Sequence, residues 1–113
     1  MGALAAITPT NAGAVSAGAA VASSDTVNVN VMGRLGAYLE IINGNASPDS
    51  ITISDSGSTP SGNALSGGTY AGSVTNGTSK VFLLKKEQAN QTTGNVTITH
   101  SVTATVTYKL YPV

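Results

Sequence analysis

Residues 94–113 read GNVTITHSVTATVTYKLYPV, and this stretch decides the fold. Apolar and hydroxyl side chains alternate along it one by one. One set of alternate positions carries Val96, Ile98, His100, Val102, Ala104, Val106, Tyr108 and Leu110, and the other carries Thr97, Thr99, Ser101, Thr103, Thr105, Thr107, Lys109 and Tyr111. Because successive side chains of a strand point to opposite faces, the pattern predicts one apolar face and one wet face. The stretch is long for one strand, so we expect two strands, with a bend or turn near residues 101–103.

The rest of the chain carries further short apolar segments separated by turn signals. Strands are expected at residues 25–30, 37–43, 50–54, 69–73 and 80–85, with a polar loop or short helical turn over residues 86–94. The strands at 37–43 and 50–54 are predicted to form a hairpin through a loop of about five residues. The count of about seven to eight short strands predicts an all-β fold, a single antiparallel β-sandwich of immunoglobulin-like or jelly-roll-like type.

Composition limits the classes of function. The 113 residues fit one domain, and only 9% of them are charged, five basic and five acidic. Nucleic-acid binding is not expected because the chain lacks a strongly basic patch. With no cysteine there is neither a disulfide framework nor a thiolate metal site. No apolar run approaches the roughly 20 residues that cross a bilayer, so no membrane partner is expected either.

The first 24 residues, MGALAAITPTNAGAVSAGAAVASS, carry no charge and consist mainly of Ala and Gly. We expect residues 1–24 to form a partly extended arm and residues 25–113 to form the sandwich domain. An arm of small residues can stay loose alone and become ordered on a partner. The alternative is a first strand that completes the protein's own sheet. The candidate partner-binding residues of the arm are Ala3, Leu4, Ile7, Thr8, Pro9, Val15 and Val21.

Residues with catalytic or metal-binding chemistry are few. His100 is the only histidine, and it occupies the apolar set of its strand. Catalysis by histidine requires an oriented partner, and no sequence motif supplies one, so we interpret His100 as a core or interface residue. Asp49 and Asp55 flank one expected strand, but the spacing of a calcium-binding loop is absent. We therefore predict no catalytic residue, no metal site and no cofactor, and hence a protein that is not an enzyme.

Three parts of the sequence resemble the small β-sandwich head decoration, or cement, proteins of tailed bacteriophages, particularly those of actinobacteria. They are the N-terminal AAITPTNAGAVSAGAAVASSDTV, the central GRLGAYLEIINGNASPDSITIS with SKVFLLKK, and the C-terminal GNVTITHSVTATVTYKLYPV. The resemblance implies a virion protein on the outer surface of an HK97-like capsid. It implies the major capsid protein as partner, and a homo-oligomer, with a trimer favoured over a dimer.

On this interpretation residues 3–25 contact the capsid or a sister subunit, and their deletion is expected to abolish capsid binding while leaving a folded core. Two other functions remain open. A surface adhesion or carbohydrate-binding module would use Tyr70 and the loop at residues 55–68 for recognition. A structural component of the phage tail or neck would share the same fold class.

Overall fold

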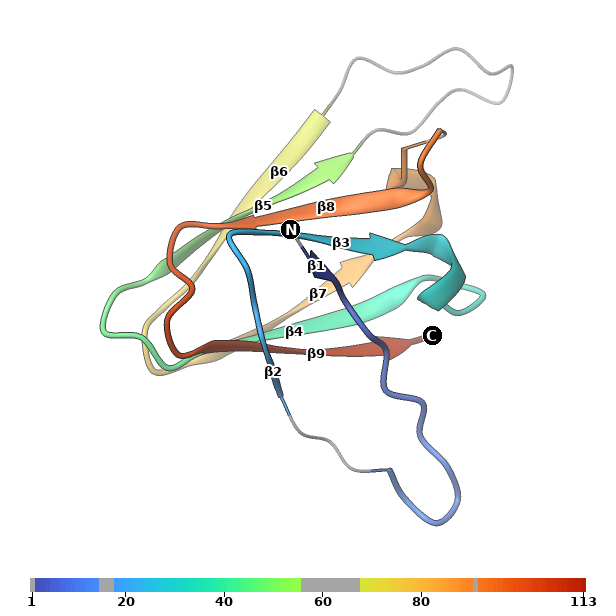
Figure 1. Cartoon of the computed structure of the whole chain (residues 1–113), viewed down its shortest axis with the longest axis horizontal. Helices are drawn as coiled ribbons and strands as arrows, with labels where there is room; N and C mark the ends of the chain where they lie inside the picture. Colours follow the sequence, from blue (N-terminus) through green and yellow to red (C-terminus); the bar gives the residue numbers. More distant parts are fainter. Residues whose placement is uncertain (1, 15–17, 56–67, 91) are drawn as a thin grey trace.

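In the computed structural model of the protein, residues 2–14, 18–55, 68–90 and 92–113 are described, except for the side chains of residues 68–70. Two sheets pack face to face as an all-β sandwich, which confirms the predicted fold class (Figure 1). One sheet has the strand order β1-β3-β8-β5-β6 and the other β2-β9-β4-β7. The strands are β1 (Gly2–Ala3), β2 (Ala19–Ala20), β3 (Ser24–Asn28), β4 (Ala37–Asn43), β5 (Asp49–Asp55), β6 (Gly68–Val74), β7 (Ser79–Leu84), β8 (Asn95–His100) and β9 (Val106–Pro112). Among the strands of the described residues, β1 and β3 are the one parallel pair.

The C-terminal stretch forms two strands, as predicted, and they belong to different sheets. β8 lies between β3 and β5, whereas β9 lies between β2 and β4. Between them a turn places the Val106 N–H 3.1 Å from the Thr103 carbonyl oxygen, and Thr105 adopts a φ of 57°. The alternation continues across this break, because the inward positions of both strands are buried. The even-numbered positions are therefore buried in both strands, and they supply side chains to the core from both sheets.

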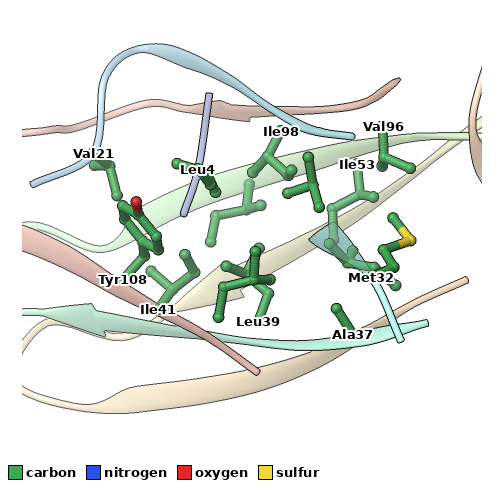
Figure 2. Close-up of a cluster of buried hydrophobic side chains, with 14 of the residues drawn as sticks. Leu4, Val21, Met32, Ala37, Leu39, Ile41, Ile53, Val96, Ile98 and Tyr108 are labelled. Carbon is green, nitrogen blue, oxygen red and sulfur yellow. The ribbon is translucent and has the colours of Figure 1, made fainter. Parts of the chain in front are cut away.

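The core consists of the inward-facing side chains of both sheets (Figure 2). Its largest fully buried members are Leu39, Ile41, Ile51, Ile53, Leu84, Ile98 and Leu110. Full burial of one such side chain stabilises the fold by roughly 1.5–3 kcal/mol. On β4 the buried residues alternate with Tyr38, Glu40 and Ile42, which are not buried, so this strand follows the predicted pattern at residues 37–43.

The predicted hairpin of residues 37–54 is wrong, because the two strands lie in opposite sheets. β4 pairs with β7 and β9, whereas β5 pairs with β6 and β8. The loop between β4 and β5 thus crosses the sandwich. The buried Asn43 amide holds the crossover, since its Nδ2 donates to the carbonyl oxygens of Ser47 (3.0 Å) and Val74 (2.9 Å). A buried amide that is bonded in this way avoids the cost of unpaired polar atoms.

The strand expected at residues 25–30 ends two residues early. Val29–Val31 forms one turn of 3₁₀ helix, because the Asn28 side-chain oxygen accepts a hydrogen bond of 2.9 Å from the Asn30 N–H. An asparagine side chain that bonds the backbone two residues on competes with the sheet ladder in this way. The short helical turn expected after residue 85 is present at Lys86–Gln88.

Residues of the N-terminal segment, 1–24, pair with strands of both sheets. β1 pairs with β3, and β2 pairs with β9. Further bonds run from the Ala5 N–H to the Tyr108 hydroxyl oxygen (3.0 Å) and from the Ile7 N–H to the Leu110 carbonyl oxygen (2.7 Å). Leu4 and Val21 are buried in the core, and Figure 2 shows Val21 pointing toward the ring of Tyr108. The segment thus completes the protein's own sheets at one side of the sandwich, which is the alternative stated for it.

Gly36 is required where the chain enters β4. Its φ is +127°, and a β-carbon built on it would lie 2.0 Å from the Leu84 carbonyl oxygen. We expect Gly36→Ala to lower the free energy of unfolding by up to about 3 kcal/mol, because strain and a backbone clash act together. Gly77→Ala is the control, since Gly77 has a φ of +78° but no atom within 4 Å of its built β-carbon. That variant should lose only about 1 kcal/mol. Equal urea midpoints for the two variants would contradict the expectation.

Candidate interaction surface

A projecting segment at residues 8–14 is the part of the N-terminal region that is available to a partner. All seven of these residues are exposed and uncharged. In Figure 1 they form the blue loop that extends beyond the body of the sandwich, and the chain then returns through β2 alongside β9. β1 and β2 pair with strands of different sheets, so the segment lies between two strands that belong to the sandwich. We call residues 8–14 the projecting segment.

A tight turn shapes the end of the projecting segment. The Gly13 N–H donates to the Thr10 carbonyl oxygen at 2.9 Å, and the Thr10 hydroxyl donates to the Gly13 carbonyl oxygen at 3.0 Å. Gly13 has a φ of +87°, a conformation that glycine adopts without strain. The residues of the segment, TPTNAGA, have small or polar side chains. Small side chains permit close approach of another backbone.

The structure divides the seven candidate arm residues into three groups. Leu4 and Val21 are core residues, so a partner cannot reach them in the folded state. Of the others that are described, Ile7 is half-buried, and Ala3, Thr8 and Pro9 are exposed; Val15 lies outside the described residues. The accessible candidates are therefore concentrated at Thr8 and Pro9, the start of the projecting segment.

His100 has a charged partner that sequence reasoning missed. Its Nδ1 lies 2.6 Å from Asp49 Oδ2, and both side chains are fully buried. With the carboxylate as the acceptor, the hydrogen of this bond lies on Nδ1. Asp49 Oδ1 also accepts from the N–H groups of Ser101 (3.0 Å) and Val102 (3.4 Å). One carboxylate thereby joins the beginning of β5 to the end of β8 and to the turn that follows it.

The other ring nitrogen of this histidine, Nε2, is buried and has no hydrogen-bond partner in the structure. An oriented Asp–His pair has the geometry of a general base, in which the free nitrogen must reach a substrate. Here that nitrogen is closed off from solvent by the core. The geometry fits a structural role, in which the hydrogen bond between His100 and Asp49 links β8 to β5. This agrees with the interpretation of His100 as a core residue.

Asp49 and Asp55 do not converge on a common site. They occupy opposite ends of β5, six residues apart. At 3.3 Å per residue this spacing corresponds to about 20 Å, far beyond the reach of one cation. In the described part of the chain, no three His, Cys, Asp or Glu side chains are grouped so that they could hold a metal ion.

The residues of the carbohydrate-binding alternative fall largely outside the described part of the chain. This holds for residues 56–67 and for the side chain of Tyr70. No pocket opens on the residues that are described. Within the same residues, no helix has the length and hydropathy needed to span a bilayer.

Comparison with known proteins adds no relative to this description: no protein-family model, no curated protein and no solved structure matches the chain.

Proposed function

We propose that the protein is a structural virion protein, a capsid decoration or cement protein that binds the outer surface of an HK97-like phage head and bridges neighbouring capsomers. The observation that carries the proposal is the projecting segment, an exposed and uncharged stretch held by strands of both sheets. The resemblance of the sequence to phage cement proteins supports the same conclusion. The proposed partner is the major capsid protein.

The anchoring of the projecting segment favours binding. A free arm loses conformational entropy over its whole length when a partner orders it. In this protein Leu4 and Val21 are already packed in the core, so the stretch that a partner has to order is shorter than the whole N-terminal region. Because the segment carries no charge, its burial against another protein also avoids the desolvation cost of an ionised group.

The arrangement suits a protein that acts in many copies. A symmetric shell offers the same site repeatedly, so contacts that are individually weak produce a stable coat when subunits are joined. We propose a homo-oligomer, a trimer in preference to a dimer, on the outer surface of the virion. No cofactor takes part in this function.

The test places charge on the projecting segment. Ala12→Glu combined with Ala14→Glu is expected to reduce binding to empty heads of the encoding phage at least about tenfold, because two carboxylates would have to be desolvated at the contact. Both positions are exposed, so the unfolding midpoint should remain unchanged. Binding is measured by co-sedimentation of the purified protein with the heads.

The matched control adds the same two charges elsewhere. Ala46 and Ala104 are exposed alanines in loops of the sandwich. The variant Ala46→Glu with Ala104→Glu should bind heads as the unmodified protein does. If the Ala12/Ala14 variant decorates heads at the unmodified stoichiometry and affinity, the projecting segment is not the contact and the proposal loses its main support.

A further inference from the structure

Large apolar side chains are exposed on the outer face of the sheet that contains β4 and β7. Tyr38 is 47% exposed, Val81 58% and Leu83 44%. Tyr38 lies directly across from Leu83 in the register of the two strands, and Glu40 lies across from Val81. Cross-strand neighbours of this kind have side chains in contact range. The three apolar residues thus form a continuous patch, which we call the β4–β7 patch.

Leu35, two residues before β4, is a further exposed apolar residue near this sheet. It is 73% exposed, the largest value among the large hydrophobic residues of the described chain. It lies in a tight turn, closed by hydrogen bonds in both directions between Gly33 and Gly36. A β-carbon on Gly36 would lie 3.3 Å from the Lys85 α-carbon, so this turn adjoins the end of β7. Exposed apolar residues that gather in one place, in contrast to isolated ones, mark interaction sites.

Most of the positive charge of the protein surrounds this patch. Of the five Lys and Arg residues, Arg34 lies in the turn beside Leu35, and Lys85 and Lys86 follow β7 directly. Lys80 lies on the opposite face of β7 from Val81 and Leu83, and its Nζ donates to the Ser73 carbonyl oxygen of β6 at 3.3 Å. Only Glu87 adds a negative charge at this end of the strand. The fifth cation, Lys109, is the cross-strand neighbour of Glu40. Although the formal net charge of the protein is zero, positive charge is in local excess next to the β4–β7 patch.

We propose that the β4–β7 patch is a docking site for another protein, whose contact surface presents apolar side chains flanked by carboxylates. Apolar contact at the centre with complementary charge at the rim is the usual composition of a protein interface. This surface is separate from the projecting segment, since β7 and β2 are the opposite edges of their sheet. The inference therefore does not depend on the proposed function.

The charges select the kind of occupant. A second copy docked patch to patch would bring Arg34, Lys85 and Lys86 of both molecules together, and like charges across an interface are unfavourable. Asp25 and Asp49 are buried, and Glu40 has Lys109 as its cross-strand neighbour, which leaves Glu87 against the three cations of a second copy. Three cations beside an apolar centre also differ from the continuous basic surface, with few apolar groups, that binds a nucleic-acid backbone. An acidic, partly apolar protein surface fits best.

The experiment selects binders without assuming the partner. A random 16-residue peptide library displayed on yeast is sorted for binding to the purified full-length protein, and each enriched peptide is then compared on the variant Tyr38→Ser/Leu83→Ser. Enriched peptides should combine apolar residues with Asp or Glu. As synthetic peptides, they should bind that variant at least about tenfold more weakly, because truncation of central aromatic and aliphatic contacts dominates such losses. Both replaced side chains are partly exposed, and an unchanged unfolding midpoint verifies the fold.

Charge variants next to the patch distinguish the proposed charge-complementary binding from non-specific hydrophobic binding. Lys85→Glu/Lys86→Glu should weaken the same peptides about tenfold, whereas Lys85→Arg/Lys86→Arg should change their affinity less than about twofold. Higher salt should weaken binding to the unmodified protein. Three outcomes would overturn the proposal. They are peptides without carboxylates, peptides that bind the Tyr38/Leu83 variant equally well, and a concentration-dependent dimer that this variant abolishes. Competition by duplex DNA would likewise reassign the surface to nucleic acid.

Discussion

Asp49→Ala is expected to lower the free energy of unfolding by about 3–5 kcal/mol, measured by urea denaturation at neutral pH. The reason is the number of donors that one carboxylate serves. His100 Nδ1 and the N–H groups of Ser101 and Val102 all bond to Asp49. Removal of the carboxylate leaves His100 Nδ1 and the Val102 N–H without this acceptor, whereas the Ser101 N–H retains its bond to the Ser50 carbonyl oxygen (3.1 Å). The histidine ring then remains buried beside a small void. Loss of one partner of a buried pair costs more than the pair itself contributes.

Two further variants show that the loss comes from the pairing. Asp49→Asn keeps the shape and one acceptor oxygen, so we expect a smaller loss of about 1–2 kcal/mol. Asp55→Ala, at the half-buried opposite end of β5, should change stability by no more than about 0.5 kcal/mol. The interpretation of Asp49 as the tie between strands is contradicted if Asp49→Ala and Asp55→Ala unfold at the same urea concentration.

A double variant measures the coupling directly. His100→Leu removes the buried ring nitrogens, including Nε2, which has no partner. Replacement of both members of a buried polar pair by apolar groups is often tolerated better than replacement of one. Asp49→Ala/His100→Leu should therefore lose less stability than the sum of the single losses, with a coupling of about 0.5–3 kcal/mol. The Val102 N–H would still lack the Asp49 acceptor, so full recovery is not expected.

The sequence predicted the individual strands well, because strand formation here is a local property. The period of two in residues 94–113 identified β8 and β9 together with the break between them. The strand expected at residues 37–43 has the same bounds in the structure. In both places one face had to be apolar to reach the core, so the pattern carries the information residue by residue. At Val29 and Val31 the same pattern continued but failed, because the Asn28 side chain redirected the chain.

Arrangement between the strands was harder to predict, because it depends on residues far apart in the sequence. A loop of five residues fits both a hairpin and a crossover between sheets, and the crossover was decided by Asn43, whose amide bonds to Val74. The contact of Asp49 with His100 spans 51 positions. A signal for it existed: both residues occupy inward positions of their strands, and a buried ionisable group requires a partner. The alternation alone did not predict that Asp49 and His100 would be each other's partner.

The N-terminal segment shows a third kind of limit. Its small, uncharged residues predict little order, because Ala and Gly bring few contacts to a core. Among its described residues, two larger side chains, Leu4 and Val21, are buried in the core, and each directly follows a strand of two residues. The ends of the segment are held by specific contacts, whereas residues 8–14 are exposed. Composition averaged over 24 residues could not separate these parts.

Leu4→Ala combined with Val21→Ala is expected to lower the free energy of unfolding by about 5 kcal/mol, since a buried Leu→Ala change alone costs about 2–5 kcal/mol. Leu4 is 5% exposed and Val21 8% exposed. Their truncation would leave space next to core residues of both sheets. For a domain whose total stability is about 5–15 kcal/mol, this loss brings the protein close to unfolding at room temperature. Thermal and urea unfolding curves provide the measurement.

Because of these core contacts, deletion of the N-terminal residues does not by itself test capsid binding. Removal of residues 3–25 takes away Leu4, Val21 and the bonds from Ala5 and Ile7, so a loss of capsid binding could follow from unfolding alone. The Ala12/Ala14 variant leaves every one of these contacts in place and should unfold within about 0.5 kcal/mol of the unmodified protein. A Leu4/Val21 variant as stable as the Ala12/Ala14 variant would mean that the segment is a detachable arm after all. A large difference between them would locate the structural and the exposed parts of the segment within one run of uncharged residues.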